Sequence, residues 1–197
     1  MRTILTIWTQ PRKTFEYLDN NEGIDPGVNL NVLYYLGALA LVIPAIPSVV
    51  SKYQTRGEPP AFLIIIALIT AFLGAFFAMA LLKYVQSYVF WKVGKVFEGK
   101  ASKSQVQMVL AYALIPGLIS LMISLVLIIV ALIKQDMNII GYQNPLTVFL
   151  IWLFGFRTLI FGLARFNRFS YGYALINVIL VTSLFQGLAW GLKYWMK

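Results

Sequence analysis

Long runs of apolar residues, separated by short polar segments, dominate the hydrophobic pattern of this chain. The hydrocarbon layer of a bilayer is about 30 Å thick and an α-helix rises about 1.5 Å per residue, so about 20 consecutive apolar residues cross it. The apolar residues of these runs lie all round a helix, whereas a helix of a soluble protein keeps one polar face. The pattern therefore predicts an all-α integral membrane bundle with N-terminal interfacial helices. Its five transmembrane helices are expected at about residues 32–50, 61–82, 106–133, 146–164 and 173–192.

The third apolar run is longer than a straight span needs. Residues 106–133 contain no charged side chain over a length that has to tilt or bend to stay within the hydrocarbon. Proline lacks the backbone N–H that an α-helix requires and clashes with the preceding turn, so Pro116 is the predicted position of a kink.

The polar segment before this run carries signals for a helix end and a helix start. Residues 84–97 are predicted to continue the second helix beyond the membrane, because valines recur there every three or four residues on one face. Gly99 is predicted to end that helix. Ser102 with Gln105 forms a capping-box pattern, which predicts that the next helix begins immediately afterwards.

The first 28 residues are predicted to form a cytoplasmic segment before a transmembrane domain of residues 29–197, the two making a single domain overall. Apolar side chains recur at helical spacing on both sides of Pro11, which predicts two short interfacial helices. Trp8 suits the headgroup layer and, with Pro11 and Phe15, is a candidate for contact with lipid or a partner. Two interpretations stay open: an anchor that rests on the membrane without a partner, and a docking surface for one.

The amino-acid composition supports a membrane protein and limits the kinds of catalytic and metal sites that it can form. Hydrophobic residues make up 60% of the chain and charged residues 12%, against about 25% charged residues in soluble domains. There is no Cys and no His, which excludes disulfides, thiolate nucleophiles, cysteine- or histidine-bound metals and Ser-His-Asp triads. The seven carboxylates are scattered outside the spans, and no glycine-rich phosphate loop occurs. We therefore expect no enzymatic activity, no cofactor and no metal site.

The distribution of Lys and Arg predicts the orientation. Ten of them lie in the N-terminal segment and in the second and fourth connections, and five on the other side, which places the N-terminus in the cytoplasm and the C-terminus outside. The net charge of +9 does not indicate nucleic acid, because the cations lie in short connections beside membrane spans. Anionic lipid headgroups are the expected partner, with Lys92, Lys95 and Lys100 as candidate contacts.

Several short motifs are similar to those of the Yip-domain family, polytopic membrane proteins named for interaction with Ypt/Rab GTPases. The resemblance implies a five-span helical domain with a cytosolic N-terminus. The chain has Glu98 where many prokaryotic members have the first glycine of a pair, and it lacks the Asp-Leu-Tyr-Gly-Pro motif and the long N-terminal region of the eukaryotic branch. It therefore resembles the short bacterial branch, which implies the bacterial cytoplasmic (inner) membrane. The motifs are residues 7–11 (Ile-Trp-Thr-Gln-Pro), Phe15, residues 99–102 (Gly-Lys-Ala-Ser), residues 111–113 (Ala-Tyr-Ala) and Pro116.

The last span carries a stripe of small residues at every fourth position, formed by Ser183, Gly187 and Gly191. Such a stripe lets two membrane helices approach closely. We expect it to serve packing within the chain, and a seam between two copies in a homo-oligomer is the alternative. A further membrane-protein partner is also compatible with the pattern.

Two functions from different classes are compatible with these observations. The first is a non-enzymatic scaffold or adaptor that engages membrane lipids or protein partners, which the basic cytoplasmic segments favour. The alternative is a small-molecule or lipid transporter, or a lipid-handling protein, with a cavity near Arg157. Arg157 is the only charged residue in the predicted spans, so it either extends to the interface or binds an anion, lipid or substrate there.

Overall fold

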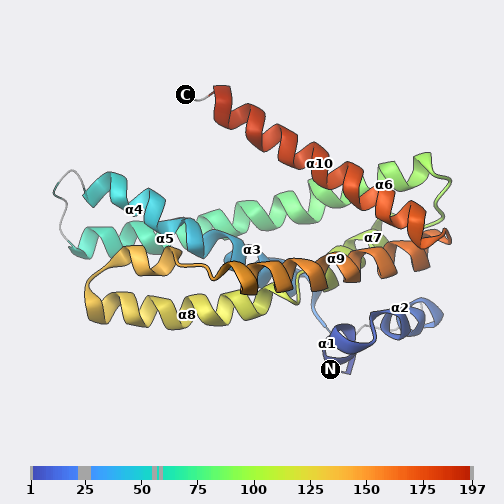
Figure 1. Ribbon diagram of the computed structural model, residues 1–197, viewed down its shortest axis with the longest axis horizontal. Coiled ribbons are helices and arrows are strands. Elements are labelled where there is room, and N and C mark those ends of the chain that lie inside the picture. The colour runs from blue at the N-terminus through green and yellow to red at the C-terminus, as the bar shows by residue number, and fades with distance from the viewer. Residues whose placement is uncertain (1, 22–27, 55–56, 58–59, 196–197) are drawn as a thin grey trace.

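The computed structural model describes residues 2–21, 28–54, 57 and 60–195. Over these residues the chain forms helices and turns and no strand (Figure 1). The elements are α1 (Arg2–Thr9), α2 (Pro11–Asn20), α3 (Leu30–Val42), η1 (Ile43–Ala45), α4 (Ile46–Gln54), α5 (Pro60–Ala80), the π-helical segment η2 (Leu81–Gln86), α6 (Ser87–Val96), α7 (Lys103–Ala113), α8 (Gly117–Lys134), η3 (Met137–Gly141), α9 (Pro145–Asn167) and α10 (Tyr171–Trp195).

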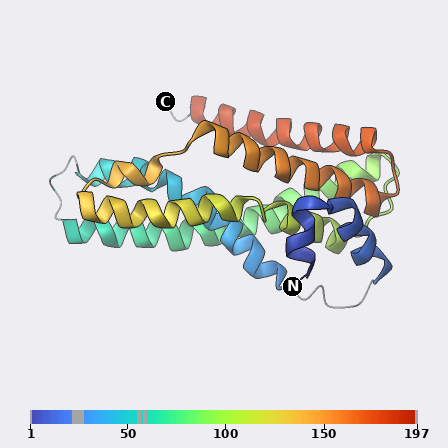
Figure 2. The ribbon, with the colours of Figure 1, turned by 60° about the horizontal axis from the view of Figure 1, so that its bottom comes forward.

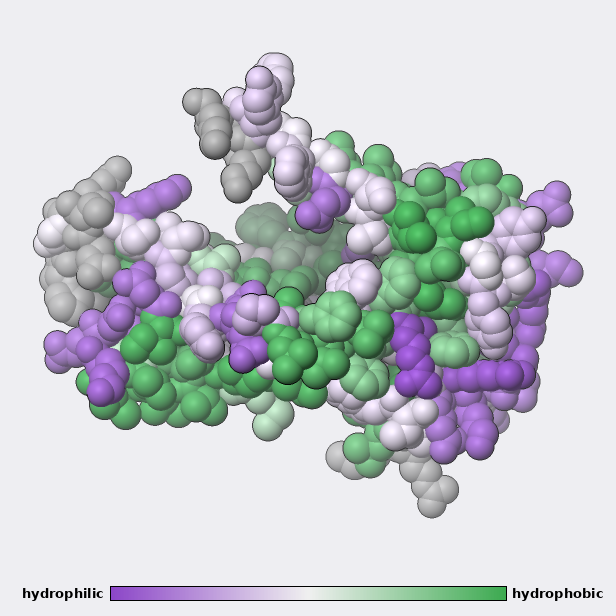
Figure 3. Space-filling view, viewed as in Figure 1, coloured by the Kyte–Doolittle hydropathy of each residue, from purple (hydrophilic) through white to green (hydrophobic). Residues whose placement is uncertain are grey.

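Five segments of the described chain are long and apolar enough to cross a membrane, which confirms the predicted fold class. Large apolar side chains cover their outer surfaces, and Figure 3 shows hydrophobic residues over the middle of the molecule with hydrophilic ones gathered towards its two ends. This distribution is the one that a bilayer requires of a protein that crosses it. The five segments are Leu30–Tyr53, Phe62–Val96, Gly117–Lys134, Met137–Asn167 and Tyr171–Gly191.

The second span is one long helix, as the sequence predicts. α5, η2 and α6 follow one another without a break from Pro60 to Val96. The 35 residues from Phe62 to Val96 are about 52 Å long, more than the hydrocarbon layer needs, so α6 extends beyond it.

The helix of the third run breaks at Pro116, where the sequence predicts a kink. α7 ends at Ala113 and α8 begins at Gly117. Between them the backbone N–H groups bond three residues back, from Gly117 to the Leu114 oxygen (2.9 Å) and from Leu118 to the Ile115 oxygen (3.0 Å). The break separates α7, whose side chains lie in the protein core, from α8, whose outer face is exposed.

The segments that connect the long helices lie at the two opposite ends of the bundle. At one end lie α1, α2, the turn after α6 and the turn between α9 and α10, and the backbone N–H of Lys100 bonds the Asn167 oxygen (3.1 Å) across them. At the other end α4 packs against η3. α10 starts at the first end and runs towards the second (Figures 1 and 2). On the way it diverges from α5 and α9 in the view of Figure 1.

The turn after α6 differs from the prediction at one residue. The backbone N–H of Gly99 bonds the Gly94 oxygen (2.8 Å) and that of Glu98 bonds the Lys95 oxygen (3.0 Å), the pattern of a Schellman motif. The left-handed residue of this motif is Glu98, with φ of 59°, so Gly99 does not hold the position predicted for it. Gly99 is required for space instead, because a Cβ there would overlap Oδ1 of Asn167.

Replacing Glu98 by glycine is expected to stabilise the protein. A left-handed backbone costs a residue with a Cβ about 1 kcal/mol, and glycine has no such cost. Glu98→Gly should therefore raise the free energy of unfolding in detergent by about 1 kcal/mol. Glu98→Ala removes the same carboxylate and keeps the Cβ, so an equal gain in both variants would contradict the backbone explanation.

Candidate functional site

The N-terminal helix pair docks on the end of the membrane bundle. Phe15 of α2 is 0% exposed, and its ring lies 6.0 Å from the rings of both Tyr112 in α7 and Phe166 in α9. Gly162 of α9 makes room for it, since a Cβ there would lie 2.9 Å from the tip of the Phe15 ring. Pro11 is buried as well. The prediction that Pro11 and Phe15 contact lipid or a partner is therefore wrong, because these apolar side chains cover the protein's own core.

Hydrogen bonds fix the pair in place beneath this apolar contact. The Tyr112 hydroxyl donates to Oγ1 of Thr3 (2.9 Å) and joins α7 to α1. The Thr14 hydroxyl donates to Oγ1 of Thr6 (2.9 Å) and joins α2 to α1. The two short helices thus form one unit with α7, rather than an anchor that rests on lipid alone.

Asp19, near the end of α2, ties this unit to the end of α9. Its side chain is 4% exposed, and Oδ2 lies 2.7 Å from Nε of Arg165 and 2.8 Å from Nη1 of Arg168. Nη2 of Arg168 also donates to Oδ1 (3.0 Å). Both arginines stand at the C-terminal end of α9, where the helix dipole favours positive charge. We call Asp19, Arg165 and Arg168 the α2–α9 clasp.

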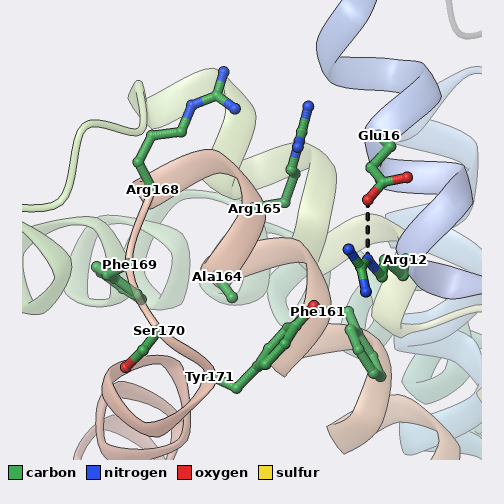
Figure 4. A pocket seen from close by; sticks show the side chains of 9 residues that line it. All are labelled: Arg12, Glu16, Phe161, Ala164, Arg165, Arg168, Phe169, Ser170 and Tyr171. Atoms are coloured by element: carbon green, nitrogen blue, oxygen red, sulfur yellow. Dashed lines mark hydrogen bonds and ion pairs between the residues drawn. The ribbon is translucent and has the colours of Figure 1, made fainter.

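A pocket of about 330 Å³ opens beside the clasp at the junction of α2, α9 and α10 (Figure 4). Arg12, Arg165 and Arg168 line it together with Glu16, and we call it the arginine pocket. Nε of Arg12 donates to the Glu16 carboxylate (3.0 Å), which raises the pKa of Arg12 and keeps it positively charged. The lining therefore holds three arginines and one carboxylate: Arg12 is paired with Glu16, and Arg165 and Arg168 are paired with Asp19.

The opposite wall of the arginine pocket belongs to the start of α10 and to α9. The rings of Phe161 and Tyr171 meet edge to face, with centroids 5.1 Å apart. Ser170 precedes α10, and its Oγ accepts from the Tyr173 N–H (3.4 Å). In the described chain no group of three acidic side chains lies close enough to hold a metal ion. Guanidinium groups bind phosphate and carboxylate oxygens.

Arg157 lies on the outer surface of α9. Its guanidinium carbon is 5.7 Å from the centroid of the Phe161 ring, one helical turn nearer the arginine pocket. The side chain thus extends towards the end of the helix, in the direction that takes a charge out of the hydrocarbon. Arg157 does not line the arginine pocket.

The remaining predicted contacts are spread over other elements. Trp8 packs against Phe154 of α9, with centroids 5.8 Å apart. The three lysines lie on or after α6 and outside the arginine pocket. Nζ of Lys92 lies over the rings of Tyr88 (5.6 Å) and Trp91 (5.1 Å), Nζ of Lys95 donates to the Gly99 oxygen (2.8 Å), and Lys100 is exposed.

The small-residue stripe of α10 does not pack inside the chain. Ser183 is exposed, and a Cβ built on Gly187 or Gly191 would meet no atom of the described protein within 4 Å. The expectation of internal packing is therefore wrong, because α10 has left the bundle at the level of this stripe.

Sequence reasoning missed Arg12, Arg165, Arg168 and Asp19 as site residues. From the sequence, Arg12, Arg165 and Arg168 served only as charges that predict the orientation. Asp19 was counted among the carboxylates scattered outside the spans. No local signal singled out Asp19, since the first 28 residues hold four acidic and three basic side chains. The pattern could not indicate which of the distant arginines it contacts.

Removing the charge of Asp19 is expected to loosen the N-terminal helix pair. Asp19→Asn leaves both arginines without their carboxylate, and hydrogen bonds to charged groups contribute about 2 kcal/mol. The opening free energy of the α2 amides, measured by hydrogen exchange, should fall by about that amount. Glu16→Gln is the control, because its ion pair with Arg12 is exposed and contributes little. Equal effects of the two substitutions would contradict the role of the clasp.

Comparison with known families accounts for nearly the whole chain. The model of the Yip1 domain matches residues 5–192, which include most of α1, all of α2 and the five spans. No curated protein and no solved structure gives a match. The resemblance carried by the short motifs is thereby confirmed, and the chain belongs to the Yip1 domain family of multi-pass membrane proteins.

Proposed function

We propose that this protein is a non-enzymatic membrane scaffold or adaptor that binds the phosphate headgroup of an anionic lipid in the arginine pocket. The observation that carries the proposal is that Arg12, Arg165 and Arg168 all line one pocket at an end of the membrane spans (Figure 4). Phosphates of a bilayer lie at that level, just outside the hydrocarbon.

The chemistry of the arginine pocket suits a phosphate. An arginine presents several N–H donors in a planar fork that matches phosphate oxygens. Arg12 and Arg168 keep 69% and 50% of their side-chain surface exposed, so both have donors available beyond their bonds to carboxylates. Phe161 and Tyr171 supply an aromatic wall of the kind that lies well at the interface between headgroups and hydrocarbon.

The docked helix pair gives the scaffold a rigid head. Because Phe15 and Asp19 hold α2 against α9, a lipid in the arginine pocket contacts the head and the membrane bundle at once. The exposed face of α2, which includes Lys13 and Tyr17, remains available to a protein partner. A bound lipid would thus stabilise the surface that a partner meets.

The orientation forms part of the proposal. The end that carries the arginine pocket holds most of the chain's Lys and Arg residues, and positive charge favours the cytoplasmic side. We therefore place this end and the N-terminus in the cytoplasm and the C-terminus outside, in a bacterial cytoplasmic membrane rich in anionic lipid.

The alternative of a transporter with a cavity near Arg157 has less support. That hypothesis needs Arg157 to point into a polar cavity at membrane depth. Arg157 instead lies exposed over Phe161, on the outside of α9. The geometry favours a snorkelling role for this residue and leaves the scaffold as the better hypothesis.

Replacing Arg12 tests the arginine pocket without disturbing the α2–α9 clasp. We expect Arg12→Gln to weaken the binding of short-chain phosphatidylglycerol to the detergent-purified protein about fivefold, the effect of about 1 kcal/mol. The measurement is the Kd from a lipid titration followed by thermal stability.

Lys13→Gln is the matched control for this titration. It removes the same charge from the next residue of α2, which is exposed and does not line the arginine pocket. Its Kd should stay close to that of the unmodified protein. Equal losses in the two variants would show that lipid responds to diffuse charge, and the proposed site would be abandoned.

A further inference from the structure

Arg157 is an exposed arginine in a span, and its charge has no carboxylate partner in the described chain. Arg165, which also lies in α9, is paired with Asp19, whereas no ion pair of the described residues includes Arg157. A charged side chain is costly where it faces acyl chains. Oxygen acceptors from outside the described chain therefore have to receive the Arg157 guanidinium.

A second copy of this protein has no carboxylate to offer from its spans. All seven Asp and Glu residues lie outside the five segments that are long and apolar enough to cross a membrane. The phosphate and ester oxygens of a lipid, by contrast, lie at the edge of the hydrocarbon, where an arginine that extends towards the interface reaches them. Charge therefore favours a lipid over a second copy as the partner of Arg157.

Arg157 lies next to the aromatic wall of the arginine pocket, on the side nearer the hydrocarbon. Its guanidinium carbon is 5.7 Å from the centroid of the Phe161 ring, and that ring meets the Tyr171 ring at 5.1 Å. Phe161 and Tyr171 both line the arginine pocket (Figure 4). One helical turn, about 6 Å along α9, separates Arg157 from Phe161. A lipid that leaves the pocket over Phe161 therefore passes Arg157.

Below Arg157 the same face of α9 is apolar and exposed. The residues of this face recur every three or four positions, the spacing that places side chains in one line along a helix. Its three leucines keep 66%, 42% and 43% of their surface exposed. Above Phe161 the same spacing reaches Ala164 and Arg168, which line the arginine pocket. We call this line the α9 stripe, and it consists of Leu146, Leu150, Leu153, Arg157 and Phe161.

The order of groups along the α9 stripe matches the order of groups in a glycerolipid. Acyl chains suit the leucines, which face hydrocarbon. The ester carbonyls come next in the lipid and accept hydrogen bonds, which a guanidinium donates. The phosphate follows, and the arginine pocket lies at that end of the stripe.

We infer that the lipid whose phosphate occupies the arginine pocket lies along the α9 stripe, and that Arg157 donates hydrogen bonds to its ester carbonyl oxygens. The inference rests on the proposed function and adds to it a second polar contact and a direction for the acyl chains. Arg157 thereby selects an acyl ester, a group that the three arginines of the pocket do not read.

A pair of lipids that differ only in the ester carbonyls tests the contact with Arg157. Dihexanoyl-phosphatidylglycerol has the carbonyls, and its ether-linked dihexyl analogue lacks them. Each is titrated into the full-length protein in an uncharged detergent, and the Kd is taken from thermal stability. We expect the unmodified protein to bind the ester lipid about fivefold more tightly than the ether lipid, the effect of one hydrogen bond of about 1 kcal/mol.

Arg157→Gln should abolish this preference by weakening the ester lipid alone. Because Arg157 is exposed, the substitution leaves no cavity in the core. Arg12→Gln should weaken both lipids equally, since both carry the phosphate. Lys13→Gln, which removes a positive charge outside the pocket and the α9 stripe, should change neither Kd.

A second pair of variants tests the path of the acyl chains. Leu153→Asn places an amide on the α9 stripe and should weaken the ester and ether lipids alike, because both have chains. Leu184→Asn is the control, since this leucine is similarly exposed on α10, away from the stripe. Equal effects of the two substitutions would remove the stripe as the path of the chains.

Two results would overturn the contact with Arg157. One is an equal loss of both lipids in Arg157→Gln, which would place its action on the phosphate or on the fold. The other is no loss of either lipid, which would leave Arg157 to water alone. Failure of the arginine pocket has a different signature, because Arg12→Gln would then leave both Kd values unchanged.

Discussion

The whole structure depends on the surrounding hydrocarbon, which accepts apolar side chains and rejects charge. In each described span, an apolar stretch of 18 residues is only 11% to 39% buried inside the protein. Lipid must therefore cover the remaining residues of that stretch. A charged side chain at the bilayer centre costs several kcal/mol, on the order of 2.5 to 3.5 on insertion scales. The ionisable chemistry of this chain is therefore confined to the two ends of the bundle, and Arg157 extends towards one of them.

At the end with the N-terminal helices, charge is organised by contacts across the chain. Asp19 meets Arg165 and Arg168 with little exposure to solvent, and Phe15 fills the space left by Gly162 beneath it. Apolar docking sets the position of α2, and the ion pairs fix its end. The same docking brings Arg12 to the two other arginines, so the arginine pocket exists only while α2 is in place.

Much of the fold can be predicted from local patterns in the sequence, whereas the arginine pocket cannot. Run length gives the number of spans, and the Ser102–Gln105 capping box and the break at Pro116 follow from residue chemistry. An apolar face of an interfacial helix looks the same whether lipid or protein covers it, so the burial of Phe15 could not be predicted. The pairing of Asp19 with Arg165 joins residues 146 positions apart, and no periodicity encodes such a contact.

The central claim is that the arginine pocket holds a lipid phosphate, and solid-state NMR measures that contact directly. The protein, labelled with ¹³C at the arginine guanidinium carbons, is placed in bilayers that contain phosphatidylglycerol, and dephasing of each arginine signal by ³¹P is recorded. We expect strong dephasing of the Arg12 and Arg168 signals. The dephasing of the Arg12 signal should disappear when the bilayer contains no anionic lipid. Absence of dephasing at both residues in the anionic bilayer would contradict it.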